Sequence, residues 1–181
     1  MTMDGSVAAI IGATVGAAGG IGGGWLTVAS QSRHYREQRR AERERWRDEM
    51  RRDAYVAYLA ATRQLNAVWW KVADQISTQG NTPSEWHSAL METHDAWAQF
   101  STASSAVAVA GPGATATAAA DLHRAMRDWE MIGVKWARAA IKDGVPHTDE
   151  HLARFGEAAS AKQAPLTAFQ QAARDALQTE R

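Results

Sequence analysis

Apolar residues recur every three or four positions along most of the chain after residue 53, which is the spacing of one buried helix face. Gly and Pro interrupt this pattern at three places and divide it into four segments. No window alternates apolar and polar residues over more than a few positions, so we expect no β-sheet. The pattern predicts an all-α fold with helices over residues 54–79, 83–110, 114–143 and from 148 onward. Because short turns join long helices, we expect an antiparallel helical bundle over residues 54–181.

The same spacing predicts which side chains point inward. In the first two helices we expect a core of Tyr55, Tyr58, Leu59, Leu65, Trp69, Val72, Ile76, Trp86, Leu90, Trp97 and Phe100. In the remaining segments we expect Leu122, Met126, Trp129, Ile132, Trp136, Ile141, Leu152, Phe155, Leu166, Phe169 and Leu177. Pro165 lacks a backbone N–H and clashes with the preceding turn, so it should kink or split the last helix near Ala164.

Polar residues and helix breakers mark the helix ends. Thr82 and Glu85 stand at the spacing of a capping box, with a hydroxyl at the N-cap and a carboxylate at the third helical position. Gly144 should stop the third helix, and Thr148 should cap the fourth. These signals place the turns between the predicted helices.

The first part of the chain has a different pattern. Residues 5–29 contain no charged side chain and exceed the roughly 20 residues that a helix needs to cross a bilayer. Small residues recur there at every fourth position, which is the stripe that lets membrane helices pack closely: Ala8, Gly12, Gly16, Gly20 and Gly24. We therefore expect a tail of residues 1–4, then a transmembrane helix over residues 5–29 that self-associates through this glycine stripe, as a glycine zipper does.

An arginine-rich segment follows. Nine arginines lie between Arg33 and Arg52, and such a flank stays on the cytoplasmic side of a membrane. We expect a charged helical stalk over residues 30–53, with the membrane interface marked by Trp25, Arg33, Arg36, Arg39 and Arg40. The N-terminus then lies outside the cell membrane and the bundle in the cytoplasm. A cleaved signal peptide and a soluble glycine-rich tail stay open as alternatives for residues 5–29, although no Lys or Arg precedes this segment as a signal peptide requires.

Charge and cysteine content narrow the partners. Residues 31–53 hold nine arginines and six acidic residues, for a net charge of +3, whereas residues 54–181 hold 11 basic and 13 acidic residues, for −2. That basic excess is weaker than the field of most nucleic-acid binders, so we expect anionic lipid headgroups and no nucleic acid beside the stalk. The chain has no cysteine, which excludes disulfides and thiolate metal sites.

One short motif matches a catalytic pattern. Residues 147–151 read His-Thr-Asp-Glu-His, the order in which inverted zinc peptidases hold zinc with two imidazoles and use the glutamate as general base. The start of a helix, with acidic residues at its positive end, explains the same residues, and no segment for a third ligand follows. The chain contains no Glu-x-x-His, no Gly-x-Ser-x-Gly and no phosphate loop. We therefore expect no enzyme, no metal and no other cofactor.

Eight tryptophans are many for a chain of this length. Two pairs, Trp69 with Trp70 and Trp129 with Trp136, could line an aromatic pocket, but at helical spacing a place in the core is more common. Because Trp69 takes the inward position, Trp70 is the best candidate for a surface contact with another protein.

The stretch from Asp4 to Asp53 also carries a resemblance. Its segments Gly-Gly-Ile-Gly-Gly-Gly-Trp-Leu-Thr and Ser-Arg-His-Tyr-Arg-Glu-Gln-Arg-Arg-Ala-Glu-Arg resemble small uncharacterised membrane-associated proteins of actinobacteria. The resemblance implies an N-terminal span followed by a helical cytoplasmic domain. It implies no activity, substrate or functional residue.

The pattern as a whole predicts a non-enzymatic, single-pass membrane protein. We expect it to form a homo-oligomer through the glycine stripe and to present the bundle to a cytoplasmic protein partner. An oligomeric membrane pore or effector subunit is the alternative, because the stripe would also allow the spans to assemble tightly around a channel. The motif at residues 147–151 keeps a metal-dependent hydrolase as a third alternative.

Overall fold

The computed structural model describes the backbone of residues 5–178 and the side chains of residues 38–178. Its helices are α1 (Gly5–Ser77), α2 (Pro83–Ala110), α3 (Gly113–Asp143), α4 (Thr148–Ala161) and α5 (Gln163–Gln178). The chain divides into two compact units, Met1–Trp46 and Arg47–Arg181. The second unit contains the bundle.

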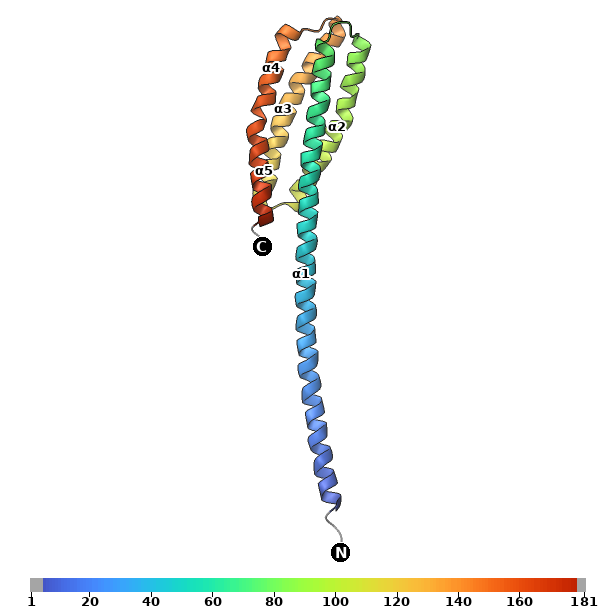
Figure 1. Ribbon diagram of the computed structural model, residues 1–181, viewed down its shortest axis with the longest axis vertical. Coiled ribbons are helices and arrows are strands. Elements are labelled where there is room, and N and C mark those ends of the chain that lie inside the picture. The colour runs from blue at the N-terminus through green and yellow to red at the C-terminus, as the bar shows by residue number, and fades with distance from the viewer. Residues whose placement is uncertain (1–4, 179–181) are drawn as a thin grey trace. The chain divides into compact units, whose positions relative to one another are not determined.

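In this second unit α1, α2, α3 and the pair α4 and α5 pack as an antiparallel bundle (Figure 1). Helices α4 and α5 follow one another along the same side, so they act as one interrupted fourth helix (Figure 1). One end of the bundle holds the α1–α2 and α3–α4 turns, and we call it the α1–α2 end. The other holds the α2–α3 turn and the end of α5, and we call it the α2–α3 end. The predicted all-α, antiparallel bundle is confirmed.

Buried positions in the bundle recur at alternating spacings of three and four. This heptad spacing keeps one face of each helix against its neighbours and suits helices that pack side by side. On α3 the buried residues at this spacing are Thr115, Ala119, Leu122, Met126, Trp129, Gly133, Trp136 and Ala140, with Ala137 buried beside them. On α1 they are Tyr55, Tyr58, Thr62, Leu65, Trp69, Val72 and Ile76, with Ala54 and Ala73 buried beside them. The Thr62 hydroxyl donates to the Tyr58 carbonyl of its own helix over 2.8 Å, whereas the Thr115 hydroxyl donates to the Ala172 carbonyl of α5 over 3.3 Å.

The helix ends follow the predicted signals with one exception. The capping box at the start of α2 is formed, and the Thr82 backbone N–H donates to Glu85 Oε2 over 2.6 Å. Gly144 ends α3 in the left-handed region at φ 66°, and its N–H donates to the Ala140 carbonyl. The prediction that Thr148 caps α4 is wrong. Thr148 is already the first helical residue, and His147 holds the N-cap position at φ 50°.

Seven predicted core residues are less buried than expected. Five are half-buried: Leu59, Trp97, Ile132, Ile141 and Leu166. For Leu152 and Leu177 the prediction is wrong, because these side chains are 40% and 36% exposed. Phe155 and Phe169 occupy the inward face of α4 and α5, and both leucines lie at its border.

The predicted split of the last helix occurs at Lys162, three residues before Pro165. The proline cannot donate to the carbonyl of Ala161, so the hydrogen-bond ladder opens one turn earlier than the proline itself. The ladder resumes where the Leu166 N–H donates to the Lys162 carbonyl over 3.1 Å. The break therefore lies between α4 and α5 and places Lys162 at the junction.

The first unit is described more sparsely. The side chains of residues 38–46 are exposed, including Arg39 and Arg40, and Arg43 Nε donates to the Arg39 carbonyl over 3.2 Å. The predicted span of residues 5–29, its glycine stripe, Trp25, Arg33 and Arg36 lie outside the described side chains. Within the part of the chain whose side chains the structure describes, no helix has a stretch long and apolar enough to cross a membrane.

Candidate interaction groove

An apolar groove of about 370 Å³ runs between α1 and α5 at the α2–α3 end of the bundle. Its walls consist of Arg52, Tyr55, Val56 and Leu59 from α1 and Gln170, Ala173, Arg174 and Leu177 from α5. Each helix therefore contributes four residues at relative positions 0, 3, 4 and 7. These positions form one stripe along a helix, so two helical stripes face each other across the groove.

The groove stays open because a small residue lies at its floor. Ala173 is buried, at 6% exposed, and its methyl group is too short to fill the space between the two helices. Val56 remains 60% exposed and Leu177 36% exposed. Exposed apolar side chains that gather in one concave place, beside polar ones, mark binding surfaces more often than scattered ones do.

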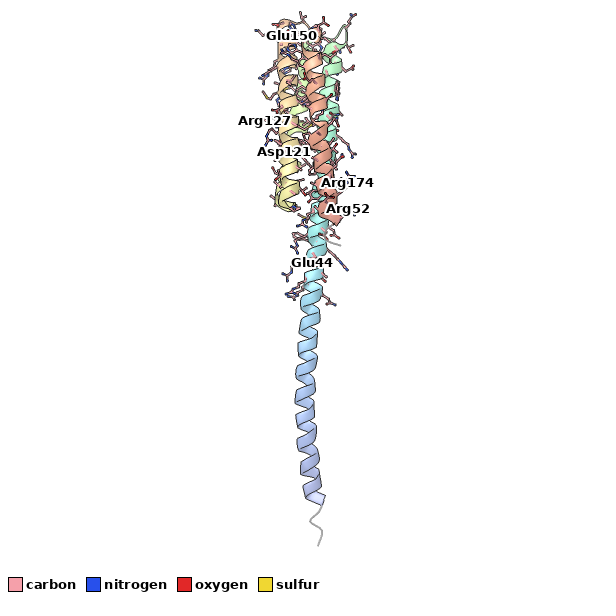
Figure 2. All side chains as sticks on the ribbon, turned by 90° about the vertical axis from the view of Figure 1, so that its left-hand side faces the viewer. Glu44, Arg52, Asp121, Arg127, Glu150 and Arg174 are labelled. Carbon is pink, nitrogen blue, oxygen red and sulfur yellow. The ribbon has the colours of Figure 1, made fainter. Side chains whose placement is uncertain are left out.

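The charged side chains that line the groove are of one sign. Arg52 and Arg174 are exposed and lie close together in the view of Figure 2. Arg174 Nε donates to the carbonyl of Gln170 over 3.2 Å, which ties its stem to α5. Among the described residues that line the groove, none carries a carboxylate. The groove therefore combines an apolar floor with a positive rim.

A second groove, about 760 Å³, lies between α1 and α2. Six alanines line it, namely Ala57, Ala60, Ala61, Ala98, Ala103 and Ala106. Three polar residues, Gln64, Gln99 and Thr102, complete its walls, and we call it the alanine groove. Its described walls include no charged residue and no large apolar side chain. It therefore offers less apolar contact and no charge with which to select a partner.

Trp70, the predicted surface contact, lies on α1 toward the α1–α2 end. It is 42% exposed, whereas Trp69 beside it is 1% exposed. Its ring packs edge-on against Phe155, with centroids 5.3 Å apart. Trp129 and Trp136 are buried, which confirms their place in the core. A contact between Trp70 and another protein stays a prediction.

The two histidines of the H-x-x-E-H motif have separate surroundings. His147 Nε2 lies 3.0 Å from Asp143 Oδ2, while the His151 ring stacks on Trp136 with centroids 6.3 Å apart. Their own ring centroids are 6.2 Å apart. Within the described part of the chain, no group of three or more His, Asp or Glu residues is placed to hold a metal ion.

Lys162 is a buried cation that the sequence reading missed. Its side chain is buried, Nζ donates to Asn66 Oδ1, and Nζ lies 3.0 Å from the centre of the Trp129 ring. Burial lowers the lysine pKa to about 7, because the charged form loses its hydration. A cavity of about 100 Å³ adjoins the amine, with Arg63 on its wall.

The sequence analysis predicted neither the buried Lys162 nor the α1–α5 groove, although the spacing of residues could have indicated both. Lys162 falls on the heptad stripe of the last helices, which is Phe155, Ala159, Lys162, Leu166, Phe169 and Ala173. The groove walls are two stripes of the same kind, each with an arginine on it. The sequence reading counted apolar residues alone, so polar residues on a buried stripe were left out.

Comparisons of the chain with known protein families, with curated proteins and with solved structures find no match.

Proposed function

We propose that this chain is a non-enzymatic, single-pass membrane protein that self-associates through its glycine stripe and presents its bundle to another protein. The groove between α1 and α5 is the observation that carries the proposal. Val56 and Leu177 keep apolar surface in water there, and both lie on the walls of this one concave site. A protein partner that covers the groove would remove this surface from water.

The membrane part of the proposal rests on the sequence. Residues 5–29 carry no charge, and the small residues at every fourth position, including Gly16 and Gly20, would let two spans approach closely. Many glycines make a single span weakly apolar, so packing against another copy would compensate. The arginines after residue 32 would hold the bundle on the cytoplasmic side and lie near anionic headgroups.

The test is the mass of the full-length chain in mild detergent, measured by light scattering. The wild-type chain should form a defined oligomer, and the double variant Gly16→Leu with Gly20→Leu should be a monomer. The double variant Thr14→Leu with Ala18→Leu is the matched control, because its leucines lie on the opposite helix face and add similar apolar surface. A monomeric wild-type chain would overturn self-association.

Membrane insertion is tested on the same chain. After expression, the wild-type protein should stay with the membrane pellet through an alkaline carbonate wash, since only inserted chains resist it. Release into the supernatant would overturn the single-pass assignment and favour a soluble glycine-rich tail.

A further inference from the structure

Resting on the proposed function, we infer that the α1–α5 groove binds one amphipathic helix of a partner protein, which carries an acidic residue on each side of its apolar face. Such a helix would cover the apolar residues of the groove, and its two acidic residues would meet Arg52 and Arg174 on the walls.

The walls have the dimensions of a helix site. A stripe from position 0 to position 7 is about 10 Å long at the helical rise of about 1.5 Å per residue, which equals two turns. A helix laid between α1 and α5 would set its own apolar residues against Val56, Leu59 and Leu177, with Ala173 at the floor. This is the way in which amphipathic helices bind to grooves, with anchors at positions i, i+3, i+4 and i+7.

The charges select the flanks of that helix. Arg52 stands on the α1 wall and Arg174 on the α5 wall, so a bound helix meets one guanidinium on each side of its apolar stripe. Guanidinium groups pair with carboxylates through two parallel N–H donors, which fixes orientation as well as charge. A glutamate or aspartate on each flank would meet this pattern, and a basic flank would be repelled.

The alanine groove between α1 and α2 shows what is special about this site. It is larger, but its described walls lack charges and offer only methyl groups and short polar side chains. A helix could approach it closely, yet nothing there would favour an acidic over a basic sequence. Of the two grooves, only the α1–α5 groove predicts a preference for an acidic over a basic helix.

The experiment uses the full chain and two designed probes. The first is a fluorescent, end-capped helical peptide with four leucines at positions 0, 3, 4 and 7 and glutamates on both flanks. The second has lysine in place of each glutamate. In fluorescence anisotropy the glutamate peptide should bind at least about tenfold more tightly than the lysine peptide, and added salt should narrow this difference.

Charge reversal tests the two arginines directly. The double variant Arg52→Glu with Arg174→Glu should reverse the preference, so that the lysine peptide binds more tightly. The control is Arg138→Glu with Arg154→Glu, which makes the same change of charge at exposed positions outside the groove and should leave the preference intact. Circular dichroism checks that all variants remain helical.

Every other outcome overturns the inference. Equal binding of both peptides, no binding of either, or an equal effect of the control pair would each show that the groove does not select an acidic helix. Vesicles containing phosphatidylserine distinguish a lipid occupant: if the groove variant loses vesicle binding while the wild type ignores both peptides, a lipid headgroup is the ligand. A monomeric chain that still prefers the glutamate peptide would overturn self-association alone.

Discussion

The two ends of the bundle are built on the same heptad spacing and each buries a cluster of rings, but they differ in how the surface closes over those rings. At the α1–α2 end, Phe155 lies among the rings of Trp69, Trp70, Trp129 and Trp136, with centroid distances from 5.0 to 6.3 Å. At the α2–α3 end, Tyr58 stacks on Phe100 and meets Phe169 edge-on, with centroids 5.2 and 4.9 Å apart, but alanines lie on the walls of both grooves that open there. Spacing thus determines which residues face one another, and side-chain volume determines whether the surface closes over them.

The α2–α3 end compensates with hydrogen bonds between helices. The Tyr58 hydroxyl donates to the Ala119 carbonyl over 2.9 Å, and Arg51 Nε donates to the Ala110 carbonyl over 3.0 Å. These bonds join α1 to α3 and to the end of α2, in the half of the bundle where the two grooves open. Directional bonds hold helices in register while leaving surface grooves free.

The largest effect should follow from removing the Phe155 ring, which lies among four tryptophan rings at the α1–α2 end. Phe155→Ala should lower the free energy of unfolding by about 3–5 kcal/mol, because four neighbouring rings lose contact around a cavity. Leu177→Ala at the groove end should cost less than about 1 kcal/mol, since this side chain is already 36% exposed. Urea unfolding followed by tryptophan fluorescence measures both. Similar costs would contradict the contrast between the two ends.

The next effect depends on pH and concerns Lys162, at the junction of α4 and α5. Its pKa in the folded chain is about 7, below the ordinary value of 10.5, so between these values the unfolded chain binds more protons. The wild-type chain should therefore gain stability as pH rises through this window, by about 1.4 kcal/mol per pH unit. Below pH 7 the full cost of the buried charge is present.

Lys162→Met removes this titration. The variant should have its greatest advantage over wild type near pH ~6, and urea unfolding near pH ~9 should find that advantage smaller by roughly 3 kcal/mol. Lys135→Met, at an exposed position, should show no such change. A Lys162→Met difference that is constant with pH would mean that the amine keeps its ordinary pKa.

A smaller effect should come from Gly133, which lies beside Trp69 and Phe155 at the α1–α2 end. A Cβ on Gly133 would lie 2.5 Å from Trp69 Cζ3 and 3.1 Å from Phe155 Cε2, so Gly133→Ala should destabilise the bundle by about 1–3 kcal/mol. Gly156→Ala is the control, because a Cβ there would meet nothing within 4 Å. It should stabilise α4 by up to about 1 kcal/mol. Thermal melts of both variants give the comparison, and a stabilised Gly133→Ala would refute the close packing.

The sequence predicted the helices and most of the core because spacing and capping are local signals. Gly80, Gly111 and Gly144 lie in or beside the turns, and the capping box at Thr82 is formed. The groove could not be predicted in the same way. Whether Val56 is covered depends on α5, which lies more than a hundred residues away and whose distance from α1 depends on the size of Ala173.

The smallest effect on stability should come from a substitution in the α1–α5 groove. It separates a surface kept open for a partner from a surface that belongs to the packed core. Val56→Asp places a charge on a side chain that is 60% exposed, so the free energy of unfolding should change by less than about 0.5 kcal/mol. Binding of the glutamate peptide should nevertheless weaken at least about tenfold, because the aspartate lies on the α1 wall of the groove beside the acidic flanks of the peptide. Val109→Asp, at a side chain 89% exposed and outside the groove, should change neither quantity. If Val56→Asp unfolds the bundle, the α2–α3 end depends on this residue for its core, and the groove is then part of the packing and cannot be a surface kept open for a partner.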